Sequence, residues 1–149
     1  MFALFTKKSV AIDVKLDQAN ELSALHAIAD TAADKLGINA QGLKASFIAS
    51  EVQGTHLIAD RILLTHTTTP DVRTPKTVLL SFKDPILWGA TGIAVDFALA
   101  IVMPAQAPEG AYATLAASAE AHLVAAADTL DALRSNASAL NQLNRTLLD

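Results

Sequence analysis

Apolar and polar positions recur at two different periods in the first third of the chain, and these periods predict its secondary structure. Residues 10–14 alternate between apolar and more polar side chains, which is the pattern of a strand with one buried face. Residues 22–36 carry apolar side chains at helical spacing. Asn20 or Asp17 can cap the start of this helix, and Gly37 can end it. The chain therefore opens with a strand followed by a helix.

The middle of the chain predicts a second helix and then several strands. A shorter helical pattern begins at Asn39 and ends at about residue 50, which leaves Glu51 in the loop that follows. Three short apolar runs rich in strand-forming residues come next, at 62–64, 78–82 and 95–103. Prolines and glycines separate these runs, as expected of turns between strands.

Helical patterns return in the last third. Residues 111–133 are rich in alanine with apolar positions along one side, and Ser135 and Asn136 restart a final helix. The order of strand, two helices, several strands and two helices is typical of a layered α/β domain. We expect one domain over residues 1–149, with a mixed central sheet of about five strands and helices on both faces.

Composition narrows the class of protein. At 149 residues with 52% hydrophobic side chains, the chain is long and apolar enough to fold as one domain. A net charge of −4 with scattered lysines and arginines gives no footprint for nucleic acid. The absence of cysteine excludes disulfides and thiolate zinc sites.

Neither a signal peptide nor a membrane span is indicated. Residues 1–5 are apolar but are followed rather than preceded by lysines, so we interpret them as mature sequence. The longest apolar run, 93–105, is interrupted by Asp96 and is shorter than the ~20 residues of a membrane helix. We expect a soluble, cytoplasmic protein that does not insert into membranes.

His66 is the best candidate for chemistry. It follows the apolar run 62–64 and precedes three threonines, so we expect it in a hydroxyl-rich loop where a strand leaves the core. Judged by position alone, a solvated surface histidine without a role is the more common outcome.

The surrounding pattern favours a role for His66. Glu51 is followed by Thr55 and His56, and then by His66 at the end of an apolar strand. This order resembles the active-site signature of the mannitol/fructose-type enzyme IIA domain of the bacterial sugar phosphotransferase system (PTS). In that family an Arg-Glu pair leads to Ser-Thr-Gly-Ile-Gly-x-Gly, an apolar triplet, a proline and the phosphorylated histidine. The resemblance matches Glu51 to the Glu, Thr55 to the Ser, His56 to the Thr, Thr65 to the Pro and His66 to the phosphohistidine.

The resemblance continues along the chain, with departures at the site itself. Residues 85–88, Pro-Ile-Leu-Trp, and the Val-Asp pair at 95–96 are similar to stretches of the family. Ser50 stands where the family has its arginine, and Leu57, Ala59 and Arg61 replace the loop glycines. The family's second active-site histidine falls near Ala111 or Tyr112.

The resemblance implies a phosphocarrier. His66 would accept a phosphoryl group from the phosphohistidine of the carrier HPr and pass it to a cysteine of enzyme IIB, without a cofactor. Contact with a membrane transporter would run through enzymes IIB and IIC, and a homodimer stays open. Two alternatives remain. One is a regulatory module like the nitrogen-related branch, with impaired phosphotransfer; the other is a paralogue kept for interaction alone.

Several side chains are candidates to support a phosphoryl group on His66. The hydroxyls of Thr55, Thr65 and Thr67 can donate hydrogen bonds, although each can equally cap a loop. Arg61 can restore the positive charge lost with Ser50, or be an ordinary surface arginine. His56 has three interpretations: a solvated loop residue, which ranks first; a phosphate donor; or half of a two-histidine metal site with His66, which lacks the spacing of zinc motifs.

Overall fold

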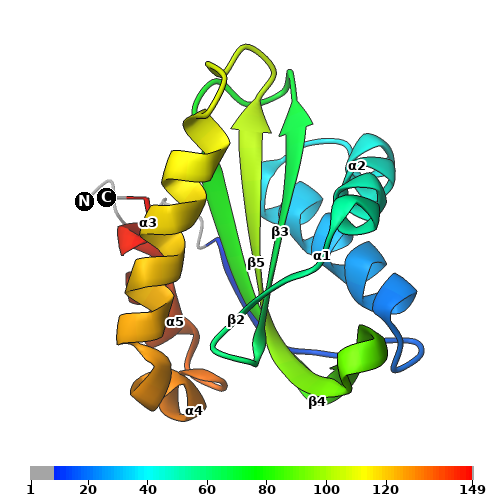
Figure 1. Ribbon diagram of the computed structural model, residues 1–149, viewed down its shortest axis with the longest axis vertical. Coiled ribbons are helices and arrows are strands. Elements are labelled where there is room, and N and C mark those ends of the chain that lie inside the picture. The colour runs from blue at the N-terminus through cyan, green and yellow to red at the C-terminus, as the bar shows by residue number, and fades with distance from the viewer. Residues whose placement is uncertain (1–8, 149) are drawn as a thin grey trace.

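The computed structural model describes residues 9–148, which form a five-stranded mixed sheet with helices on both faces (Figure 1). This confirms the predicted fold class. The order across the sheet is β1-β4-β5-β3-β2. The strands are β1 (Val10–Val14), β2 (His56–Ile58), β3 (Ile62–Thr69), β4 (Lys76–Trp88) and β5 (Ile93–Pro104). The interpretation of residues 1–5 as mature sequence falls outside the described residues.

Helices cover the two faces of the sheet in separate groups, as Figure 1 shows. One face carries α1 (Glu21–Leu36) and α2 (Ala40–Gln53). The other carries α3 (Ala111–Ala125), α4 (Leu130–Leu133) and α5 (Ala137–Thr146). Each group packs on its own cluster of buried apolar side chains, so the sheet separates two cores. Among the described helices, none is long and apolar enough to cross a membrane.

The prediction that β3 ends before His66 is wrong. The strand continues to Thr69 because it pairs in parallel with β5 along its whole length, from Ile62 opposite Phe97 to Thr69 opposite Pro104. On its other side it pairs with β2 only over residues 62–64. His66 therefore lies inside a strand, on the part of the edge that β2 does not cover.

Other predicted boundaries also move. Helix α2 runs to Gln53, so Glu51 lies in the helix rather than in a loop. The expected helix over 111–133 is broken, since α3 ends at Ala125 and a short 3₁₀ turn, η3 (Ala127–Thr129), leads into α4. Strand β4 is longer than predicted and passes through Pro85, where its register with β5 shifts. A second 3₁₀ turn, η2 (Gly89–Thr91), connects β4 to β5.

The predicted caps of α1 and the predicted start of α5 are confirmed. The side chain of Asn20 caps α1 by accepting a hydrogen bond from the backbone N–H of Ser23 at 2.8 Å. Gly37 ends α1 in the left-handed conformation, with φ of 70°. Asn136 caps α5 through the backbone N–H of Ala139. These ends depend on local chemistry, which is why sequence alone locates them.

Candidate functional site

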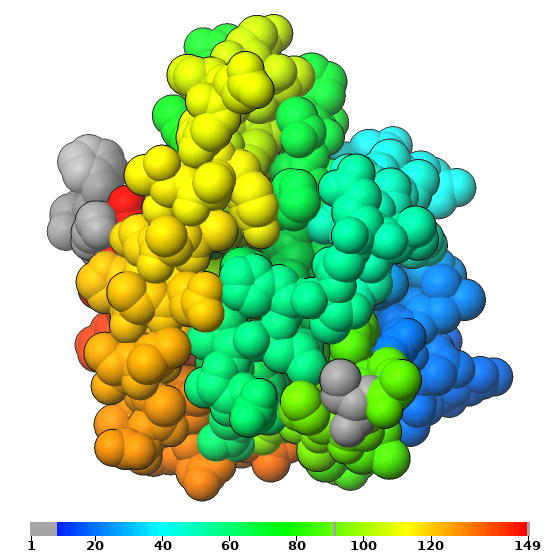
Figure 2. Space-filling model, viewed as in Figure 1, coloured from blue at the N-terminus to red at the C-terminus, as the bar shows by residue number. Residues whose placement is uncertain are grey.

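His66 lies in a groove between two helices that belong to opposite faces of the sheet. Figure 2 shows this hollow between α3 and α2, with β3 between them. Side chains alternate along β3, so His66 and Thr68 lie on the α3 side, whereas Thr65 and Thr67 are buried on the other side. The His66 side chain is half-buried. Because the strand edge is uncovered here, groups from both helices can reach the imidazole.

Ser50 holds one ring nitrogen of His66. Its Oγ is 3.0 Å from Nδ1, which is hydrogen-bonding distance. Ser50 lies in the last turns of α2, and its neighbour Glu51 holds that end of the helix in place through two hydrogen bonds. The Glu51 carboxylate accepts a hydrogen bond from Trp88 Nε1 at 3.0 Å and another from the Thr55 hydroxyl. Glu51 and Thr55 thus fix the helix end that carries Ser50.

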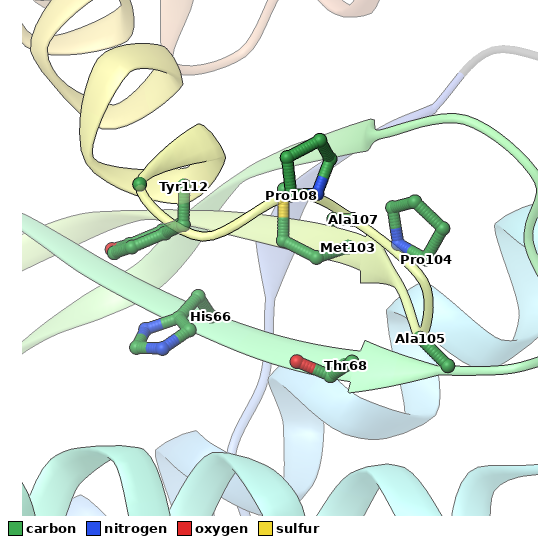
Figure 3. Close-up of a pocket in the computed structure, with 9 residues that line it drawn as sticks. His66, Thr68, Met103, Pro104, Ala105, Ala107, Pro108 and Tyr112 are labelled. Atoms are coloured by element: carbon green, nitrogen blue, oxygen red, sulfur yellow. The ribbon is translucent and has the colours of Figure 1, made fainter.

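Tyr112 covers one face of the imidazole. The two ring centroids are 3.9 Å apart with an angle of 23° between the ring planes, which is a stacked arrangement (Figure 3). Tyr112 lies in the first turn of α3, directly after the Gly110 turn. Gly110 has φ of 84°, a conformation that favours glycine, so it allows the chain to turn into α3 beside β3.

A pocket of about 230 Å³ opens beside the stacked rings. Its lining consists of His66, Thr68, Met103, Pro104, Ala105, Ala107, Pro108, Gly110 and Tyr112 (Figure 3). None of these side chains is acidic or basic apart from His66 itself. Gly110 and Tyr112 bring the N-terminus of α3 to the pocket wall, and a helix N-terminus presents backbone N–H donors and a partial positive charge.

Burial shifts the pKa of both stacked side chains, His66 and Tyr112. Desolvation lowers the pKa of His66 below its ordinary value, so the imidazole is neutral at pH 7. Desolvation raises the pKa of Tyr112, so its phenol stays protonated. The pocket therefore offers a neutral imidazole with nucleophilic capacity, a phenol O–H, and the helix N–H groups.

The structure does not bring Arg61 to this pocket. The guanidinium donates to both carboxylate oxygens of Asp96, at 2.9 and 2.6 Å, and to Asp131 at 2.7 Å. It also lies over the Phe97 ring, 5.2 Å from the centroid. Hydrogen bonding to Asp96 raises the pKa of Arg61 further above its ordinary value, so the group stays charged but engaged.

The remaining predicted supports are also directed elsewhere. The hydroxyls of Thr65 and Thr67 are buried on the α2 side of β3 and have no hydrogen-bond partner among the residues that the structure describes. His56 Nε2 lies 3.0 Å from a carboxylate oxygen of Glu120, which connects β2 to α3. Over residues 9–148, no group of three or more histidine, aspartate or glutamate side chains is arranged to hold a metal ion.

In the sequence, two residues of the site are visible only as departures from the family pattern. Ser50 stands where the family has its arginine, and Tyr112 lies at or next to the position of the family's second histidine. The structure brings both into contact with His66. The signal that could have identified them was present, because a residue that replaces an active-site group inherits its place in the fold.

Comparisons with known proteins agree with this architecture. Residues 3–145 match the family model described as phosphoenolpyruvate-dependent sugar phosphotransferase system, EIIA 2. The crystal structure of the nitrogen regulatory protein IIA-Ntr from Neisseria meningitidis has a TM-score of 0.73 at 9% identity, covering 91% of this chain and 92% of that one. A domain assigned to the PTS IIA class in Streptococcus pyogenes has a TM-score of 0.72 at 15% identity, covering 99% of this chain and 95% of that one.

The search of curated proteins gives no match. At these low identities the two solved structures establish the shared fold, whereas the family model extends over nearly the whole chain. The chain therefore belongs to the EIIA 2 family of the phosphoenolpyruvate-dependent sugar phosphotransferase system.

Proposed function

We propose that this enzyme IIA domain is a phosphocarrier in which Nε2 of His66 accepts a phosphoryl group from the phosphohistidine of an HPr-like protein and passes it to a cysteine of an enzyme IIB. The proposal rests on the hydrogen bonding and the protonation of the His66 imidazole. Nδ1 is engaged by Ser50, the imidazole is neutral, and Nε2 has no hydrogen-bond partner among residues 9–148. This role implies a cytoplasmic protein.

The transfer balances through the two ring nitrogens. Nε2 attacks phosphorus with its lone pair, the N–P bond of the donor breaks, and its electron pair returns to the donor ring. The His66 ring then loses its Nδ1 proton, and the donor ring takes up one proton. In the second step the N–P bond at His66 breaks, an S–P bond forms on a cysteine thiolate, and His66 regains its proton.

Ser50 suits both states of this cycle. Before transfer, its hydroxyl oxygen can accept a hydrogen bond from Nδ1–H, which leaves the lone pair on Nε2. After transfer, Nδ1 carries a lone pair, and the same hydroxyl can donate to it. A hydroxyl both accepts and donates, whereas an arginine only donates. Ser50 therefore keeps the ring oriented through the whole transfer.

Labelling by phosphorylated HPr tests this proposal. HPr carrying ³²P, made with enzyme I and labelled phosphoenolpyruvate, should transfer an acid-labile phosphate to the wild-type domain. The label should disappear in His66→Ala. His26→Ala is the matched control, because His26 lies on α1, does not line the pocket of His66, and should leave labelling unchanged. The absence of transfer to the wild type, or labelling that persists in His66→Ala, contradicts the proposal.

A second candidate is a regulatory module that acts by binding a protein partner. The observation in its favour is that, among residues 9–148, no lysine, arginine or acidic side chain lines the pocket, so a phosphoryl group meets no cation from this part of the chain there. In this case a partner captured from lysate by the wild type should also be captured by His66→Ala. Capture that requires His66 phosphorylation returns the role to phosphotransfer.

A further inference from the structure

Tyr112 and Ser50 approach the same imidazole from different directions. Ser50 meets Nδ1 at 3.0 Å from the α2 side, and Tyr112 stacks on one ring face at 3.9 Å from the α3 side. The two residues come from elements that pack on opposite faces of the sheet, and His66 is their common contact. Figure 3 shows the two rings lying face to face, with the pocket beside them.

We propose that Tyr112 is a positioning residue for phosphotransfer: its stacked ring keeps the His66 imidazole in the orientation in which Ser50 occupies Nδ1 and Nε2 alone is open to the donor. This inference rests on the proposed function and adds a residue to it. Tyr112 acts through His66 and does not itself need to touch the phosphoryl group.

The geometry of nitrogen lone pairs supports this role. The lone pair of an imidazole nitrogen lies in the ring plane, so a side chain stacked on the face does not block attack at Nε2. The same side chain does block rotation of the ring about the Cβ–Cγ bond, because a turned imidazole would collide with the phenol ring. A half-turn exchanges Nδ1 with Cδ2 and Nε2 with Cε1, so a turned or tilted ring loses the Ser50 contact at Nδ1, and the stacked phenol restricts such motion. Stacking thus selects which nitrogen reacts.

The size of the effect follows from the strength of aromatic pairs. A stacked pair of aromatic rings is favoured over an unstacked pair by roughly 2- to 10-fold, in addition to the effect of the apolar area that the pair buries. The ratio of Nε2 to Nδ1 phosphorylation should therefore fall by about that factor when stacking is lost. The hydrogen bond to Ser50 maintains the remaining preference.

A competing role for Tyr112 is direct donation of its O–H to the phosphoryl group. Phenylalanine separates the two roles, because Tyr112→Phe keeps the stack and removes only the hydroxyl. Leucine at this position keeps apolar bulk and helix propensity but cannot stack. Because Tyr112 is half-buried in the first turn of α3, both variants are expected to fold, and their unfolding midpoints confirm it.

Phosphoramidate is the probe, since it transfers a phosphoryl group to imidazole nitrogens with loss of ammonia and needs no protein partner. ³¹P NMR of the labelled proteins distinguishes Nε2 from Nδ1 phosphohistidine at His66. Wild type and Tyr112→Phe should both give Nε2 product, and Tyr112→Leu should show the Nε2 to Nδ1 ratio lowered by roughly 2- to 10-fold. An unchanged ratio in Tyr112→Leu overturns the proposal. A ratio in Tyr112→Phe as low as in Tyr112→Leu assigns the effect to the hydroxyl and overturns it as well.

If phosphoramidate does not label the wild-type protein, NMR of the unmodified protein provides a second test. The ¹⁵N shifts of the His66 ring and its contacts to residue 112 report orientation in the unmodified protein. Wild type and Tyr112→Phe should show one ordered ring, and Tyr112→Leu an averaged one; identical rings in all three overturn the proposal. Ordered positioning in a protein that phosphorylated HPr never labels would instead show that the proposed function fails while the positioning role holds.

Discussion

Removing the Arg61 guanidinium should weaken the fold and leave the chemistry of His66 unchanged. Asp96 is 11% exposed at its side chain, and Arg61 supplies it with two short hydrogen bonds. In Arg61→Met the carboxylate keeps, among the described cations, only Arg134, whose Nε is 3.4 Å away. The variant therefore leaves a largely buried carboxylate poorly compensated.

The magnitude follows from this burial. Breaking a buried ion pair by removing one partner costs about 3–5 kcal/mol. The Arg61 side chain is 24% exposed and Arg134 stays close, so we expect a smaller loss of about 2–3 kcal/mol in the free energy of unfolding. For a chain of this length, that loss corresponds to a Tm lowered by about 5–10 °C.

Urea unfolding followed by circular dichroism measures the loss. The matched control is Arg73→Met, since Arg73 is exposed and forms no ion pair within residues 9–148; its stability should change by less than about 0.5 kcal/mol. Phosphorylation of His66, measured well below the Tm, should be equal in wild type and both variants. The reasoning is refuted if Arg61→Met keeps full stability and loses phosphorylation tenfold, because Arg61 would then serve the phosphoryl group directly.

Three further predictions concern the site and its surroundings. Ser50→Ala removes the Nδ1 hydrogen bond, worth about 1 kcal/mol net, so the rate of His66 phosphorylation by phosphorylated HPr should fall by roughly 2- to 10-fold; an unchanged rate would remove Ser50 from the site. The pKa of His66 is lowered in the folded state, so its contribution to stability is present above about pH 6.5 and is lost as pH falls through the folded pKa. Urea unfolding from pH 7 to 5 should therefore show a steeper loss in wild type than in His66→Gln. Gly110→Ala places a Cβ at φ of 84° and should lower stability by about 1–2 kcal/mol, which thermal unfolding can check.

Sequence patterns predict the helices and the sheet better than they predict the site. The caps at Asn20 and Gly37 lie within one turn of the helix that they end, so local chemistry determines them. The end of β3 depends instead on β5, a strand distant in sequence that pairs with it as far as Thr69. A threonine run after an apolar triplet is compatible with a loop or a strand. Pairing with β5 makes residues 65–69 part of the strand.

The site shows the same dependence on distant residues. Arg61 is a reasonable phosphate ligand by its sequence distance from His66, but its partners are Asp96 and Asp131, 35 and 70 residues further along the chain. Tyr112 could be located only through the family position of a missing histidine. Neither assignment follows from spacing near His66, because tertiary packing brings α3 to His66 and brings β5 and α4 to Arg61.

The charge balance of the pocket bears on which function the domain can perform. A phosphoryl group on Nε2 adds about one to two negative charges. No lysine or arginine of residues 9–148 lines the pocket, and the α3 N-terminus supplies only about half a positive charge. A phosphoryl group on His66 would therefore be less stabilised than one held by an arginine, which would favour its onward transfer at equilibrium. A carrier needs only a transient phosphohistidine, whereas a signal needs a lasting one. This balance favours transfer, or partner binding by the unphosphorylated domain, over regulation through a long-lived phosphohistidine.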